Sequence, residues 1–108
     1  MNLPTEVFGD IAVVHAPEEI GRENATQIAE FLLSRDRCRV VVDLDGTESI
    51  DGAGLTALLD VQDRLRESGG DLKVITTNLA NRKILEITRL DQQLDVFTNV
   101  IDAVKTFA

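Results

Sequence analysis

Residues 40–70 join a short apolar run, a polar turn and an amphipathic stretch. Residues 40–44 read Val-Val-Val-Asp-Leu, a β-branched run typical of a strand that is covered on both faces. After the turn, apolar residues recur at steps of three and four, which is the helical period, and Gly69 and Gly70 end the pattern. The stretch is therefore predicted to be a strand, a tight turn and a helix, whose inward face contains Leu55, Leu58, Leu59, Val61, Gln62 and Leu65.

Similar patterns predict the other strands. They are expected near residues 5–8, 11–15, 71–77 and 94–97, and Gly9 with Asp10 indicates a hairpin turn between the first two. Residues 18–19 are predicted to be an acidic loop, and residues 90–93 close the helix before the last strand.

Three more helices are expected, after Asn24, after Asn78 and over residues 99–107. Asn24 and Gln27 have the spacing of a capping box. Alternating strands and helices predict one α/β domain over residues 1–108, with a mixed four- to five-stranded sheet, residues 40–44 as its central strand and about four helices mainly on one side. The last helix is expected to place Val100, Ile101, Val104 and Phe107 on one face.

The turn at residues 49–56 carries the most informative local chemistry. Asp51 can cap the following helix by accepting a backbone N–H, while Gly52 and Gly54 let the backbone turn sharply and approach a neighbour closely. Ala53 is expected to be exposed on the first helical turn. Free N–H groups at a helix start attract anions, so this turn is a candidate binding surface.

Composition restricts the partners. The formal net charge of −8 argues against nucleic acid and against insertion into an anionic membrane, and favours a basic protein surface. Cys38 is the only cysteine, so an intramolecular disulfide is excluded, and the sequence has no signal peptide and no 18-residue apolar run. We therefore expect a cytoplasmic protein.

Other candidate sites are weaker. Asp43 and Asp45 lie at the carboxyl end of a predicted strand as in response-regulator receivers, but the acidic pair and the lysine that such a site also needs are missing. His15 has no neighbouring metal ligand in the sequence, and Cys38 lies among arginines with no activating histidine. Arg35, Arg37 and Arg39 are interpreted as a solvated connector. No metal or cofactor is expected.

Two segments resemble the STAS domain, the fold of bacterial anti-sigma factor antagonists. Residues 51–55 read Asp-Gly-Ala-Gly-Leu, similar to the Asp-Ser-Ser-Gly-Leu or Asp-Ser-Thr-Gly-Leu turn of that family. Residues 17–25 are similar to the family's Pro-x-Glu-Ile-Asp-x-x-Asn-Ala, except that Gly21 stands where an Asp is common. Matching segments extend along nearly the whole chain.

The resemblance implies a non-enzymatic module that binds an anti-sigma factor kinase and so frees a sigma factor. In the family, the second hydroxyl of the turn is phosphorylated, and the added charge breaks the complex. Ala53 occupies that position and has no oxygen, so the off-switch is expected to be missing. Ser49 and Thr56 are nearby hydroxyls, but a kinase geometry set for position 53 is expected to miss both. The implied partner-binding residues are Asn24, Asp51, Gly52, Ala53, Gly54, Leu55 and Thr56.

Two alternatives stay open. The chain can be a structural STAS subunit of a membrane transporter or a larger signalling complex, in which a phosphoacceptor is unnecessary. It can also be an enzyme or a nucleotide-binding domain, although the segment 52–54 lacks the lysine and the spacing of a phosphate-binding loop.

Overall fold

The computed structural model describes residues 1–34 and 39–107. Its main sheet has five strands in the order β1 (Thr5–Phe8), β2 (Ile11–His15), β4 (Arg39–Asp43), β6 (Asp71–Ile75) and β7 (Asp95–Phe97). The strand β1 pairs with β2 in an antiparallel hairpin, and all other neighbours are parallel. The predicted mixed sheet with a central strand near residues 40–44 is confirmed. Arg35, Arg37 and Cys38 lie outside the described residues.

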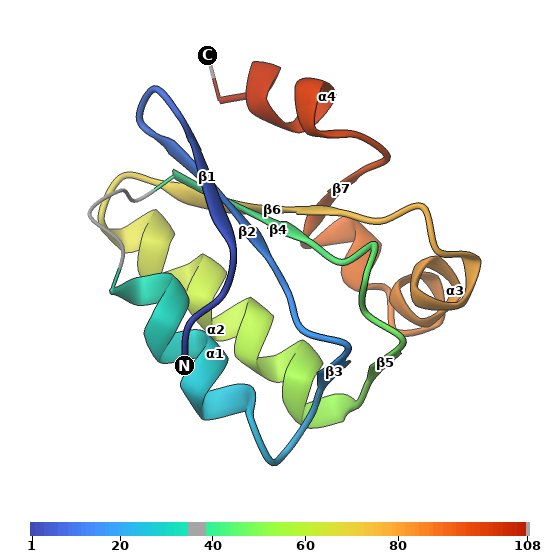
Figure 1. Ribbon diagram of the computed structural model, residues 1–108. Helices are drawn as coiled ribbons and strands as arrows, with labels where there is room; N and C mark the ends of the chain where they lie inside the picture. The colour runs from blue at the N-terminus through green and yellow to red at the C-terminus, as the bar shows by residue number, and fades with distance from the viewer. Residues whose placement is uncertain (35–38, 108) are drawn as a thin grey trace.

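The described residues form four α-helices, most of which cover one face of the sheet. The helices α1 (Ala25–Leu33) and α2 (Gly52–Glu67) lie side by side under that face, and α3 (Leu79–Ile87) contributes Leu85 to the same core. The short helix α4 (Val100–Lys105) packs on the opposite face (Figure 1). A 3-10 turn, η1 (Leu90–Gln92), connects α3 to β7. The predicted one-sided arrangement is therefore confirmed, with α4 as its exception.

The strand β4 explains why its sequence is apolar on both faces. Val40 and Val42 point into the core beneath α1 and α2, whereas Val41 points into the smaller core beneath α4. All three side chains are almost completely buried. Full burial of a valine side chain stabilises the fold by about 1.5–3 kcal/mol, so both layers of helices depend on this strand.

A second sheet of only two strands lies beside the first. The strand β3 (Glu19–Ile20) pairs in parallel with β5 (Ser49–Ile50). The prediction that residues 18–19 form a loop is therefore wrong for Glu19. Two-residue strands contain too few positions to show an alternating pattern, so the sequence carried no signal for this pairing.

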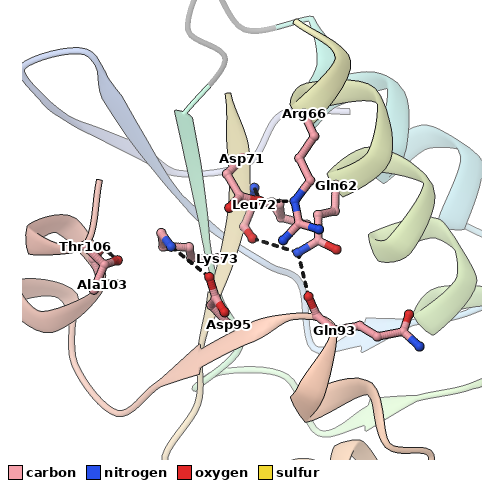
Figure 2. Close-up of polar contacts among 9 residues, drawn as sticks. All are labelled: Gln62, Arg66, Asp71, Leu72, Lys73, Gln93, Asp95, Ala103 and Thr106. Carbon is pink, nitrogen blue, oxygen red and sulfur yellow. Dashed lines mark hydrogen bonds and ion pairs between the residues drawn. The ribbon is translucent and has the colours of Figure 1, made fainter. Parts of the chain in front are cut away.

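The polar contacts within the cores were not predicted. Gln62, which the sequence places correctly on the inner face of α2, donates from Nε2 to the carbonyl oxygens of Leu72 at 3.3 Å and Gln93 at 3.0 Å (Figure 2). On the other face, Lys73 is 6% exposed and lies 2.9 Å from Oδ2 of Asp95. Its ammonium also lies 5.7 Å and 4.9 Å from the ring centroids of Phe97 and Phe107. These contacts satisfy the buried amide and ammonium groups.

The residues on the inward face of the last helix differ from the predicted ones. Ile101 is 65% exposed, whereas Ala103 is fully buried against the sheet. The helix starts at Val100, and the small Ala103 side chain lets its backbone approach β4 and β6 closely. The predicted inward position of Ile101 is therefore wrong, while Val100, Val104 and Phe107 do pack on this core. No helix in the described part of the chain is both long and apolar enough to cross a membrane.

Candidate functional site

Asp51 connects the start of α2 to the loop before α1. Its Oδ1 accepts the backbone N–H of Gly54 at 3.0 Å, which confirms the predicted helix cap. Its Oδ2 accepts the backbone N–H of Arg22 at 3.1 Å, a bond that was not predicted. These hydrogen bonds, with that from Gly54 the stronger, hold the pKa of the Asp51 carboxyl below its ordinary value of 3.8. Asp51 is thus a fixed negative charge that joins two segments.

Two glycines allow these segments to come together. A Cβ atom at Gly54 would lie 2.7 Å from the carbonyl oxygen and from Cγ2 of Ile20, so any side chain there would push α2 away from β3. A Cβ atom at Gly21 would lie 2.7 Å from Oδ2 of Asp51, in the path of its bond to Arg22. The replacement of the family's common Asp by Gly21 therefore fits the closed arrangement of Asp51 and Arg22 in this chain.

Ala53 is exposed on the first turn of α2, as predicted. Gly52 beside it is exposed, and a Cβ atom there would meet nothing within 4 Å. Thr56 is also exposed, one turn further along the helix. Gly54 and Leu55, in contrast, are buried, and Leu55 is only 7% exposed. These two residues support the surface from below and do not form part of it.

Asn24 has a different role from the one predicted. No hydrogen bond from its side chain caps α1, so the predicted capping box is wrong. Its Oδ1 accepts the N–H of Gly21 at 2.9 Å, and its Nδ2 donates to the carbonyl oxygen of Glu19 at 2.7 Å. Because the amide holds the 19–24 loop beside the start of α2, it cannot also bond to the first turn of α1.

The two segments enclose a hollow. Residues 19–24 and residues 49–53 line an open depression of about 650 Å³, and we call these residues the loop surface. Ser49 and Ala53 both line it, whereas Thr56 lines the neighbouring groove between α1 and α2. The sequence did not point to Arg22, because it acts here through its backbone N–H. The unusual Gly21 next to it was the available signal.

Asp43, the last residue of β4, and Asp45, two residues later, both contact neighbouring residues through their carboxylates. Oδ2 of Asp43 lies 3.1 Å from Nδ1 of His15, whose Nε2 lies 2.7 Å from Oε1 of Glu6. Oδ1 of Asp45 accepts the N–H of Thr77 at 2.6 Å and its hydroxyl at 3.0 Å. Within residues 1–34 and 39–107, no group of three His, Cys, Asp or Glu side chains could hold a metal ion. The contacts of Asp43 and Asp45 therefore hold neighbouring segments in place.

The fold and the loop surface define a small α/β domain that presents the start of a helix at a turn beside a second, short sheet. A family model described as "Mlab, STAS domain" matches residues 8–101. The chain belongs to the STAS domain family, as the two resembling segments had implied.

Relatives and solved structures agree with this assignment. A protein of Thermotoga maritima named "Putative anti-sigma factor antagonist" is 21% identical over 106 residues, which cover 94% of each chain. The crystal structure of a putative anti-sigma factor antagonist from Thermotoga maritima gives a TM-score of 0.86 at 20% identity and covers 97% of this chain and 93% of that one. An anti-sigma factor antagonist from Mycobacterium paratuberculosis gives 0.84 at 21% identity, with 98% and 92% covered.

The same fold also occurs inside a much larger protein. The murine anion transporter Slc26a9 gives a TM-score of 0.79 at 13% identity over 94% of this chain, but only 18% of the transporter chain is covered. At such identities these likenesses show the fold alone.

Proposed function

We propose that this protein is a cytoplasmic anti-sigma factor antagonist, which binds an anti-sigma factor kinase through the loop surface together with Thr56 and thereby frees a sigma factor. The names of its relatives support this function. The observation that carries the proposal is the position of Ala53, which is exposed on the first turn of α2 where the family's phosphorylated hydroxyl is expected. The protein acts by binding and carries out no reaction itself.

The missing hydroxyl determines the kind of regulation. A phosphate on this turn would add almost two negative charges at the centre of the contact, and repulsion and desolvation would break the complex. Asp51 already places one fixed negative charge there. Because Ala53 cannot be phosphorylated, the antagonist stays active whenever its partner is present.

The test uses purified protein and the purified anti-sigma factor kinases encoded in the same genome. Wild-type protein is expected to bind one of them equally with ADP and with ATP, and mass spectrometry is expected to find no phosphate on residues 49–56. The Ala53→Ser variant restores a target hydroxyl, so its binding should become sensitive to ATP. If wild-type protein acquires phosphate at Ser49 or Thr56 and dissociates, the switch has moved to that residue and the proposal of a lost switch is wrong.

A second candidate function is a STAS subunit of a membrane transporter or a larger signalling complex. The presence of the fold in the anion transporter Slc26a9 favours it. This function predicts co-purification with an ATP-binding-cassette subunit, no kinase partner, and no effect of ATP on the assembly of Ala53→Ser. Binding to a purified kinase and co-purification of a transporter subunit from native cells therefore separate the two functions.

A further inference from the structure

A groove runs between α1 and α2 on the outer side of these helices. The two helices follow parallel strands of one sheet and so run in the same direction, side by side (Figure 1). The groove has a volume of about 640 Å³. Small and apolar side chains that are buried or half-buried form its floor, namely Ala25, Ala29, Leu33, Ala57 and Val61. The floor is therefore an apolar strip accessible to another protein.

Charged side chains stand along the rims of this strip. Arg22 lines the end next to Gly52, Glu30 and Asp60 line the middle part from opposite helices, and Arg64 lines the far end. Glu30, Asp60 and Arg64 are exposed and form no ion pair with any described residue. Asp60 and Arg64 are four residues apart on α2, a spacing that allows an ion pair, and yet they make none. These charges are available to a partner.

The groove is continuous with the loop surface. Arg22, Gly52 and Ala53 line both the hollow at the loop and the near end of the groove. A protein that covers Ala53 therefore reaches the first residues of the apolar strip, and a single extended element can occupy both.

We propose that the groove between α1 and α2 docks one amphipathic helix of the anti-sigma factor, so that this helix and the loop surface form one interface. The inference rests on the proposed function. The groove extends from Gly52 to Arg64, about 18 Å at 1.5 Å per residue, which is the length of a helix of about 12 residues. The docked helix presents an apolar ridge to the alanine floor, a Lys or Arg to Glu30 and Asp60, and an acidic residue to Arg64.

The net charge favours a helix of a basic partner over a second copy of the chain as the occupant of the groove. Each copy has a net charge of −8, so two copies repel each other, whereas a basic segment is attracted. The same charge disfavours an anionic membrane surface. A partner helix with a central basic residue and an acidic residue opposite Arg64 pairs with both carboxylates and with that guanidinium.

The first test blocks the floor. Ala57→Arg places a long charged side chain across the apolar strip, and it should weaken binding of the anti-sigma factor roughly tenfold or more, because this side chain would occupy the space that the apolar ridge of the docked helix fills. Ala57 is half-buried, so the new side chain can reach solvent in the free protein. Ile101→Arg makes the same change at an exposed position of α4 on the opposite face, and its affinity should stay within about twofold of wild type.

The second test reverses the rim charges. The double variant Glu30→Lys with Asp60→Lys should weaken binding roughly tenfold, because it repels the basic residue of the docked helix. Asp63→Lys with Glu67→Lys changes the net charge equally and alters exposed residues of α2 that do not line the groove. Equal weakening by both double variants would mean that only the total charge matters, which overturns the inference.

The remaining outcomes separate this inference from the proposed function. If wild type and Ala57→Arg bind the anti-sigma factor equally, the groove proposal is wrong while the antagonist function stands. If wild type binds no anti-sigma factor, both fail. If the chain forms a dimer that Ala57→Arg dissociates, the occupant is a second copy and the proposal is overturned.

A photo-crosslinker at Thr26 gives an independent readout should Ala57→Arg not fold. It should capture a helical, lysine- or arginine-containing peptide of the partner, and a failure to crosslink in the bound complex contradicts the proposal.

Discussion

Oδ2 of Asp51 accepts the backbone N–H of Arg22, 29 residues earlier in the chain, at 3.1 Å. This bond holds the loop before α1 against the start of α2, while the other carboxylate oxygen caps α2 itself. One side chain thus fixes the relative position of the two segments that form the loop surface.

The hydrogen bonds of the Asp51 carboxylate, from Gly54 first and then from Arg22, make stability depend on pH in a defined direction. The pKa of Asp51 is lowered from 3.8 in the folded protein, so its stabilising effect is complete above 3.8 and is lost as the pH falls through the lowered value. In urea titrations from pH 7 to pH 2, wild type should therefore be more stable than Asp51→Asn at neutral pH, and the difference should shrink below pH 4. A constant difference across this range would show that the carboxylate charge does not matter.

The two glycines of the turn should respond in opposite ways to alanine. Gly54→Ala forces a Cβ atom to 2.7 Å from the carbonyl oxygen of Ile20, and the free energy of unfolding should fall by about 1–3 kcal/mol. Gly52→Ala is the matched control, because a Cβ atom there enters open space. It should leave stability unchanged or raise it by up to about 1 kcal/mol. Urea denaturation measures both, and equal effects would contradict the close contact at Gly54.

The ion pair between the buried Lys73 and the exposed Asp95 can be tested with a double-mutant cycle. Asp95→Ala leaves the Lys73 ammonium, 6% exposed, without its carboxylate, and should lower the free energy of unfolding by about 1–3 kcal/mol. Adding Lys73→Met removes the unpaired charge and keeps most of the volume, so the double variant should be more stable than Asp95→Ala alone. If the double variant is less stable, the rings of Phe97 and Phe107 retain the ammonium without help from Asp95.

A permanent negative charge at position 53 should act on binding and not on folding. Ala53→Glu should weaken binding of the anti-sigma factor, since the charge lies at the centre of the proposed contact, while the melting temperature stays close to that of wild type because the position is exposed. Calorimetric titration together with thermal unfolding checks both. Unchanged affinity would remove Ala53 from the interface.

Association should be steered by charge. A protein of net charge −8 that meets a basic surface should associate more slowly as salt rises, while dissociation changes less. Stopped-flow rates over a salt series test this expectation. An association rate that is flat or rises would show that the charge serves solubility alone.

The sequence predicted the elements whose signal is repeated over many residues. The β-branched run of β4, the inner face of α2 and the cap at Asp51 could all be read directly. Sequence-based prediction failed where a single tertiary contact determines the role of a side chain. The side-chain amide of Asn24 bonds to Glu19 and Gly21 and so cannot cap the first turn of α1. Whether it bonds to the loop or to the helix depends on the position of the 19–21 loop, and no sequence pattern gives that position.

The same limit applies to the site. The exposure of Ala53 followed from its place at a helix start and the burial of Leu55 from the helical period, but the close approach of Gly54 to Ile20 of β3, a two-residue strand, did not. Lys73 lies in an apolar layer because Asp95 and two rings come from elements that are distant in sequence. Local periodicity contains no information about such partners.

The pairing of β3 with β5 separates the loop surface from the main sheet. Its two segments bond chiefly to each other, through Ile20, Asp51 and Arg22, and neither contributes a strand to the five-stranded sheet. Ile20 and Ile50 anchor these segments in the main core, so residues 19–24 and 49–53 can be exchanged as a pair where both isoleucines are kept. Transplanted as a pair from another member of the family, they should transfer partner choice, whereas either segment transplanted alone would lose the complement that shapes it.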